Sequence, residues 1–71
     1  MTGENRARDI LKFIKEFKTG HGYSPSVREI RDGVGISSTS MTHRWLRAMA
    51  ARGWVRWVAG KGRTIQVTRE V

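Results

Sequence analysis

The chain has 71 residues, no cysteine and a formal net charge of +8. We expect one domain over residues 1–71, because a chain of this length supports only one compact core. The composition excludes a disulfide scaffold and a zinc site built from thiolates, and no apolar run is long enough for a membrane span. With a polar amino terminus that lacks an apolar signal core, the sequence predicts a cytoplasmic protein.

The positive charge is unevenly distributed along the chain. Residues 1–35 carry seven Lys or Arg against five acidic residues, a net charge of +2, whereas residues 36–71 carry seven against one, a net charge of +6. Such an asymmetry favours a polyanionic partner for the carboxyl-terminal half, and we expect nucleic acid. A basic surface that only confers solubility is the alternative.

Residues 4–19 are predicted to form the first helix. Apolar residues recur at helical spacing from Ala7 to Phe17, and charged residues fall on the opposite side. We expect Gly20 to end this helix in the left-handed conformation, with His21 in the following loop. A basic amphipathic helix can also lie on a membrane, but the apolar elements that follow favour a core helix.

A short second helix is predicted to start at Ser26. Ser26 and Glu29 have the spacing of a capping box, in which the hydroxyl and the carboxylate accept hydrogen bonds from amides of the first turn. Gly33 weakens the helix interior and Gly35 is expected to close the helix. Ile36 is interpreted as an apolar plug before the next helix.

The third helix is predicted over residues 38–52, with Ser37 or Ser38 as its cap. One side carries the residues expected to face the core: Thr42, Trp45, Leu46 and Met49. The other side has no acidic residue and is basic and hydroxyl-rich: Ser40, His43, Arg44, Arg47 and Ala51.

The pattern changes after Gly53, which is expected to end the third helix. Residues 54–58 and 64–68 are rich in β-branched and aromatic residues and predict two strands, with Ile65 and Val67 facing inward. The glycine-containing loop between them has hairpin length. Helix, helix, tight glycine turn, helix and hairpin is the order of a winged helix-turn-helix, mainly α with a small antiparallel β-hairpin.

The outward face of the third helix is predicted to read DNA, because the major groove admits one α-helix and its exposed donors can meet base edges. Arg44 is the strongest candidate, since its planar fork can pair with guanine, a contact worth roughly 1–3 kcal/mol of discrimination. The alternatives are capping for Ser38, partial burial for Met41 and solvation for His43. The predicted base-reading residues are Ser38, Ser40, Met41, His43 and Arg44.

The loop at 59–63 is predicted to act as a wing on the DNA backbone or in a neighbouring minor groove. Its glycines permit close approach, and its cations can neutralise phosphates; a plain hairpin turn is the alternative. A nucleotide-binding loop is not expected, because a strand rather than a helix follows. The predicted DNA-backbone residues are Ser26, Arg28, Arg47, Arg52, Lys61 and Arg63.

We predict no enzyme activity, no cofactor and no metal site. The sequence has no Cys nucleophile, no suitably spaced acid pair and no Gly-flanked serine elbow, and no acid cluster accompanies His43. Trp45, Trp54 and Trp57 are expected to pack in the core rather than stack on single-stranded bases, with one strand tryptophan partly exposed.

Four features together carry a family resemblance: "GYSPSVREI", the Gly35-Ile36 turn, "LRAMAARGWV" and the hairpin length. Over nearly the whole chain they resemble the amino-terminal DNA-binding domain of LexA-type repressors. The resemblance implies a winged helix-turn-helix that docks its third helix in the major groove of an operator. It also implies that the family's base-reading positions correspond to the five base-reading residues named above.

Two departures from the family are informative. Ser40 stands where members often carry asparagine, and His43 and Arg44 stand where they often carry glutamate, which replaces acceptors for cytosine by donors for guanine. We therefore expect an operator unlike the usual SOS box. The family's carboxyl-terminal domain, with its cleavage site, catalytic serine and lysine and dimer interface, is absent from this sequence. The expectation is a short regulator of a phage or mobile element, or a repressor fragment, that does not cleave itself.

The sequence thus predicts a sequence-specific, nucleoid-associated transcriptional regulator, most simply a repressor, with a double-stranded DNA operator as partner and neither membrane nor small-molecule substrate. Two copies are expected on paired half-sites, and about 5–7 phosphate contacts predict a log–log salt slope of about −5 to −6. The alternatives are a protein-interaction winged helix that engages a host regulator, and a non-specific architectural DNA binder.

Overall fold

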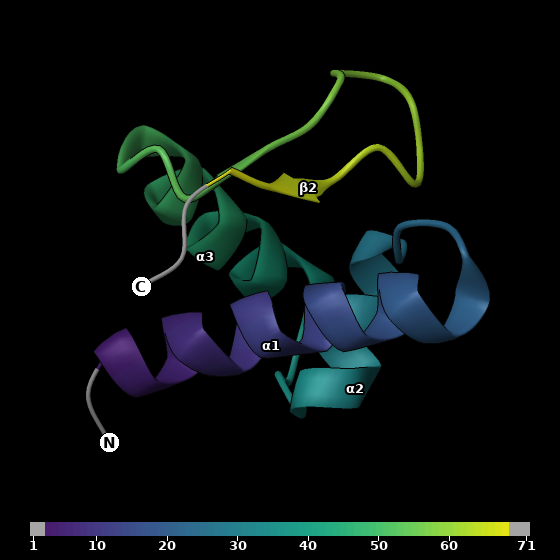
Figure 1. The fold of residues 1–71 in the computed structure, drawn as a ribbon. Helices are drawn as coiled ribbons and strands as arrows, with labels where there is room; N and C mark the ends of the chain where they lie inside the picture. Colours follow the sequence, from purple (N-terminus) through teal and green to yellow (C-terminus); the bar gives the residue numbers. More distant parts are fainter. Residues whose placement is uncertain (1–2, 69–71) are drawn as a thin grey trace.

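The computed structural model describes residues 3–68, which form three helices followed by a two-stranded hairpin (Figure 1). The strands pair antiparallel, with Val55 opposite Val67 and Arg56 opposite Gln66. This architecture confirms the predicted winged helix-turn-helix. The elements are α1 (Gly3–His21), α2 (Val27–Val34), α3 (Thr39–Ala51), β1 (Val55–Arg56) and β2 (Gln66–Val67).

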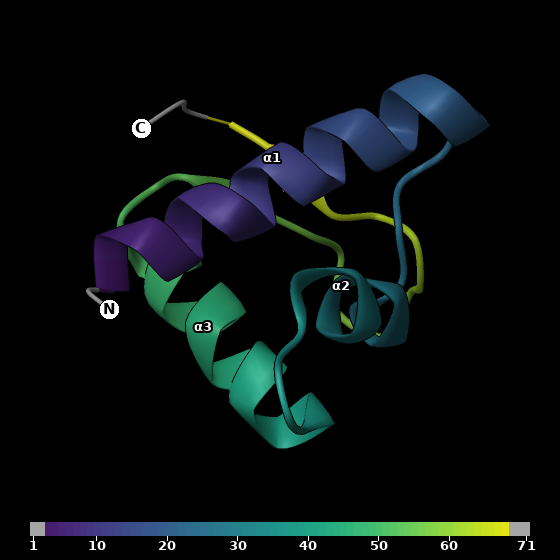
Figure 2. The same ribbon diagram turned by 90° about the horizontal axis from the view of Figure 1, so that it is seen from below.

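The core lies where α1 meets the other elements. Figure 2 shows α2 and α3 on the same side of α1, and Figure 1 shows the hairpin closing the remaining side. The three helices and the hairpin all contribute apolar side chains to it. The buried hydrophobic residues are Ala7, Ile10, Leu11, Ile14, Ile30, Ile36, Leu46, Met49, Val55 and Ile65.

The first helix extends two residues further than predicted. Gly20 is helical, and Gly22 takes the left-handed conformation (φ 80°) and donates its N–H to the Lys18 carbonyl oxygen at 2.8 Å. The His21 ring stacks on Phe17 with 3.9 Å between centroids, and its Nδ1 lies 3.1 Å from the Phe17 carbonyl oxygen. Residues four apart are neighbours on a helix, so this stack continues α1 past Gly20. The placement of His21 in a loop was therefore wrong.

The capping box of α2 is confirmed. The Ser26 hydroxyl accepts from the Glu29 N–H at 3.2 Å, and the Ser26 N–H donates to Glu29 Oε1 at 2.8 Å. Gly35 closes the helix with φ 85°, and the N–H groups of Gly35 and Ile36 both donate to the Arg31 carbonyl oxygen. Ile36 is buried between the helices, as the sequence predicted.

Side chains as well as the glycine turn fix α2 against its neighbours. Arg31 Nη1 donates to Thr39 Oγ1, in the first residue of α3, at 2.9 Å. From α1, Arg6 Nη1 donates to the Val34 carbonyl oxygen at 3.2 Å, at the end of α2. In Figure 2, α2 is seen nearly end-on while α3 runs across the view, so the two helices cross steeply, as in a helix-turn-helix.

The regular strands are shorter than predicted. Trp54 belongs to the turn after α3, because its N–H donates to the Met49 carbonyl oxygen at 3.0 Å. Beyond β1, the Val58 N–H donates to Thr64 Oγ1 at 2.9 Å, so a side chain replaces the next rung of the backbone ladder. The connection between the strands consequently spans 57–65 rather than 59–63.

The three tryptophans depart in part from the expectation of core packing. Trp45, Trp54 and Trp57 each pack against the core, but all three are only half-buried. Trp54 also accepts a cation: the Arg52 guanidinium lies 5.2 Å from its ring centroid. Three indoles therefore cover the edges of the core, where a small domain has too little interior to enclose them.

Candidate nucleic-acid interface

The third helix has one buried side and one exposed side, as predicted. Thr42, Leu46 and Met49 are almost fully buried. Thr42 is the buried polar residue of this side; its hydroxyl donates to the Ser38 carbonyl oxygen at 3.0 Å and so needs no solvent. The exposed side carries hydroxyl, imidazole and guanidinium groups: Ser40, His43, Arg44 and Arg47.

The structure bears on the alternatives for two of the predicted base-reading residues, Ser38 and Met41. Ser38 is the N-cap of α3, and its hydroxyl oxygen accepts from the Met41 N–H at 3.1 Å. Because a hydroxyl has its own proton, capping leaves Ser38 able to donate outward. Met41 is 41% exposed, so its thioether lies at the rim of the outward face rather than in the core.

The wing and the middle of α3 share one groove. A cavity of about 230 Å³ is lined by His43 and Leu46 of α3, by Trp57, and by wing residues from Gly60 to Arg63. The exposed wing and the exposed imidazole therefore lie on the same side of the molecule. Within residues 3–68, the structure gives the Lys61 ammonium no hydrogen bond or ion pair.

The predicted backbone-contacting residues fall into two groups. Arg28, Arg47 and Lys61 are exposed, and their cations can meet phosphates without breaking a bond shown in the structure. The other three already contact partners in this chain: Ser26 in the capping box, Arg52 over the Trp54 ring, and Arg63 in an ion pair with Glu29.

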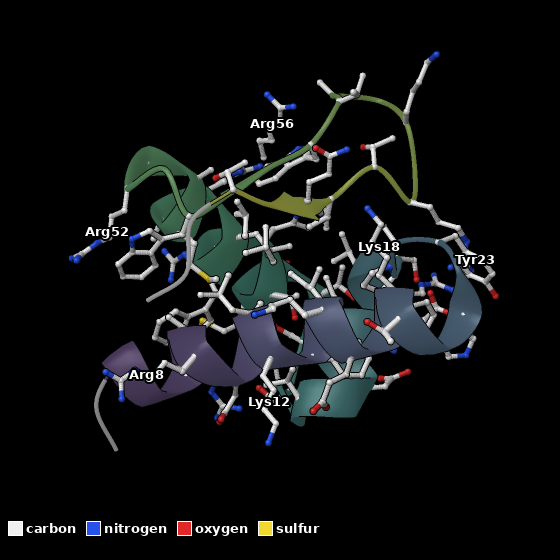
Figure 3. The ribbon with its side chains drawn as sticks, viewed as in Figure 1. Arg8, Lys12, Lys18, Tyr23, Arg52 and Arg56 are labelled. Carbon is white, nitrogen blue, oxygen red and sulfur yellow. The ribbon has the colours of Figure 1, made fainter. Side chains whose placement is uncertain are left out.

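Positive charge also lies away from α3. Arg8 and Lys12 project from the side of α1 that faces away from the hairpin, and Arg56 projects from the outer side of the hairpin (Figure 3). Arg56 Nε donates to Gln66 Oε1 at 3.4 Å across the strands. Positive charge alone therefore does not single out one surface; what marks the outward face of α3 is that no acidic residue lies among its exposed side chains.

The carboxylate of Glu29, which pairs with the wing residue Arg63, accepts hydrogen bonds from two groups. The backbone N–H of Ser26 and the guanidinium of Arg63 both donate to Glu29, and together they lower the pKa of its carboxyl from the ordinary value. Glu29 therefore stays ionised at neutral pH and compensates one cation beside the interface. The sequence reading identified its role in the capping box but missed its partner, which lies 34 residues away.

Within residues 3–68 there is no group of three His, Cys, Asp or Glu side chains arranged to hold a metal ion. Over the same range, every helix is too short or too polar to cross a bilayer.

Comparison with known proteins agrees with this geometry. The family model of the LexA DNA binding domain matches residues 4–64. The LexA repressor of Roseiflexus sp. (strain RS-1) is 56% identical over 50 residues, which cover 70% of this chain and 23% of that protein. The LexA repressor of Clostridium novyi (strain NT) is 44% identical over 69 residues, covering 97% and 34%.

A third relative, the LexA repressor of Bacillus velezensis (strain DSM 23117 / BGSC 10A6 / LMG 26770 / FZB42), is 45% identical over 65 residues, covering 92% of this chain and 32% of that protein. The chain thus spans about a quarter to a third of the length of these curated relatives. Since the match extends over far more than half of its residues, the chain belongs to the family of LexA DNA-binding domains.

Proposed function

We propose that this protein binds double-stranded DNA sequence-specifically and regulates transcription as a LexA-like repressor, by occluding a promoter at the nucleoid. The observation that carries the proposal is the outward face of α3, which is exposed, free of acidic residues and flanked by the wing. A protein-binding face would have an apolar centre with few charges, whereas this face has hydroxyls and guanidiniums. The names of the relatives support the same function.

In the proposed complex, α3 enters the major groove. Ser38, Ser40, Met41, His43 and Arg44 meet base edges, with Arg44 paired to guanine O6 and N7. The wing at 59–63 follows the adjacent backbone or minor groove, with Lys61 on a phosphate. Because both His43 and Arg44 can donate, the half-site contains guanine where a glutamate-bearing relative would select cytosine.

Two copies are proposed to bind the paired half-sites of one operator. One module contacts only a few base pairs and phosphates, so joint occupation of two half-sites supplies the affinity that one site lacks. The contact between the copies forms on DNA, through the hairpins or through a partner protein. Analytical ultracentrifugation with one-site and two-site duplexes distinguishes these arrangements.

Selection from random duplexes at two salt concentrations tests the proposal directly. The expected result is an enriched motif that contains guanine, with a log–log salt slope near −5 for one module, at about −0.9 per phosphate contact. Arg8→Ala is the matched control. Arg8 projects from the side of α1 that faces away from the hairpin (Figure 3), so its loss is expected to leave the selected motif and the salt slope unchanged.

Two other outcomes would replace the proposal. Tight binding of every duplex with no enriched motif indicates an architectural binder that recognises only the backbone. Flat titrations even in dilute buffer indicate a protein-interaction module, which uses the same fold without DNA.

A further inference from the structure

Arg63 lies on the wing, but its guanidinium is turned toward the body of the protein. Nη1 donates to Glu29 Oε1 at 2.7 Å and to the Ser24 carbonyl oxygen at 3.3 Å, and Nη2 donates to Glu29 Oε2 at 3.3 Å. The same guanidinium lies 4.8 Å from the centroid of the Tyr23 ring. In Figure 3, Tyr23 is found beyond the end of α1, on the side to which the wing descends.

The backbone at Arg63 gives a second, independent observation. Its φ is 57°, which lies in the left-handed region. Among residues 3–68, every other residue with a positive φ is a glycine. An L side chain is strained there, and glycine adopts the conformation without strain. The same loop has glycine at positions 60 and 62, whereas position 63 has arginine. An arginine at this strained position indicates that its side-chain contacts outweigh the strain.

The partner of Arg63 is itself held in place. Glu29 accepts from the Ser26 N–H at 2.8 Å in the capping box, so its carboxylate is fixed at the start of α2. On the wing, Thr64 Oγ1 accepts from the Val58 N–H at 2.9 Å and lies 3.1 Å from the Lys61 carbonyl oxygen. The loop is thus closed on itself, and Arg63 joins this closed loop to α2.

We propose that Arg63 is a positioning residue: its guanidinium fastens the wing to Glu29 and Tyr23, so that Lys61, and not Arg63, meets the DNA phosphate. This replaces the sequence-based prediction that Arg63 contacts the backbone. The part about the phosphate rests on the proposed function, whereas the fastening of the wing does not.

The fastening is tested without DNA by ¹⁵N relaxation of the Gly60, Lys61 and Gly62 amides. Glu29→Gln removes the ion pair and leaves the capping box, because glutamine also serves at that position. The expected result is that Glu29→Gln and Arg63→Ala lower the order parameters of these amides below about 0.6. Glu16→Gln, an equal charge change on the exposed side of α1, leaves them at the wild-type value.

Arg63→Lys separates fastening from phosphate binding. Lysine keeps the charge that a phosphate needs, but it lacks the planar fork that reaches both Glu29 oxygens and stacks on Tyr23. We expect Arg63→Lys to loosen the wing as Arg63→Ala does. Unchanged order parameters in Glu29→Gln and Arg63→Ala overturn the fastening, whatever the protein does with DNA.

A double-mutant cycle on the selected duplex tests the second half of the proposal. If Arg63 acts through Lys61, then Arg63→Ala, Lys61→Ala and the double variant each reduce the salt slope by the same amount, about 0.9. If each residue binds its own phosphate, the double variant reduces the slope by about 1.8 and Arg63→Lys keeps the wild-type slope, which refutes the proposal. The two proposals can fail separately. If the protein binds no DNA but the wing still becomes mobile in Glu29→Gln and Arg63→Ala, the proposed function is refuted and the role of Arg63 in holding the wing is supported.

Discussion

Gly33 of α2 faces the ring of Phe13 in α1 with no space between them for a side chain. A Cβ atom on Gly33 would overlap Cε2 of the Phe13 ring, well inside van der Waals contact. Since both residues lie within helices, Gly33 serves close approach rather than a special backbone conformation. The close approach lets the half-buried Phe13 ring cover the junction of α1 and α2.

Gly33→Ala is expected to destabilise the protein by about 1–3 kcal/mol, even though alanine is the better helix former, because the Phe13 ring must leave its site. Gly20→Ala is the control with opposite sign. Gly20 is also helical and has no atom within 4 Å of a built Cβ, so alanine there stabilises by about 0.5–1 kcal/mol. Urea unfolding followed by tryptophan fluorescence measures both; equal stability of Gly33→Ala and wild type contradicts the prediction.

Local chemistry explains which parts of the fold could be predicted from the sequence. The capping box of Ser26 and Glu29 and the left-handed Gly35 depend on residues a few positions apart, and both are confirmed. The inward side of α3 follows from helical periodicity alone and is also confirmed.

The features that sequence analysis missed depend on residues far apart in the chain. Gly33 looked like a weakness of α2, because Phe13 is 20 positions earlier in the sequence. The ion pair of Arg63 was missed, because its partner Glu29 is 34 positions away. The misplaced end of α1 is a local exception: Gly20 stays helical, and the Phe17 and His21 rings, four residues apart, stack across it.

Ser38→Ala is expected to destabilise the protein by about 1 kcal/mol, because it removes the acceptor that caps the first turn of α3. The sequence left Ser37 and Ser38 as alternative caps, and the structure assigns the cap to Ser38. Ser37→Ala is therefore the matched control, with an expected change within about 0.5 kcal/mol. Thermal unfolding at pH 7 distinguishes the two, and equal losses refute the assignment.

The Glu29 carboxylate is expected to stabilise the folded state in a pH-dependent way. Its pKa is lowered in the folded protein, first by the Ser26 backbone N–H and then by the Arg63 guanidinium, from an ordinary value of 4.5. The stabilisation is therefore complete above pH 4.5 and is lost as the pH falls through the lower, folded-state pKa. Urea unfolding of wild type and Glu29→Gln from pH 7 to pH 2 measures it.

The difference in unfolding free energy between these two proteins should be largest at neutral pH and vanish in acid. Asp32, whose pKa the Arg31 guanidinium lowers, titrates equally in both proteins and cancels from the comparison. A difference that stays constant across this range means that the ionised carboxylate contributes nothing and that only the hydrogen bond to Ser26 matters.

Base reading and backbone contact are expected to respond differently to mutation. Arg44 lies on the outward face of α3, one turn after Ser40, where its fork can reach a base edge. Arg44→Ala should therefore weaken binding to the preferred duplex by about 1–3 kcal/mol and weaken binding to duplexes changed at the guanine much less. Selectivity is then relaxed at one or two base pairs.

Lys61→Ala should weaken binding to all duplexes equally and reduce the salt slope by about 1, because a phosphate carries no sequence information. Titrations of single-base variants of the selected duplex measure both patterns. If Arg44→Ala lowers the affinity for every duplex by one common factor, then Arg44 contacts the backbone, and the guanine specificity must come from His43 or Ser40 instead.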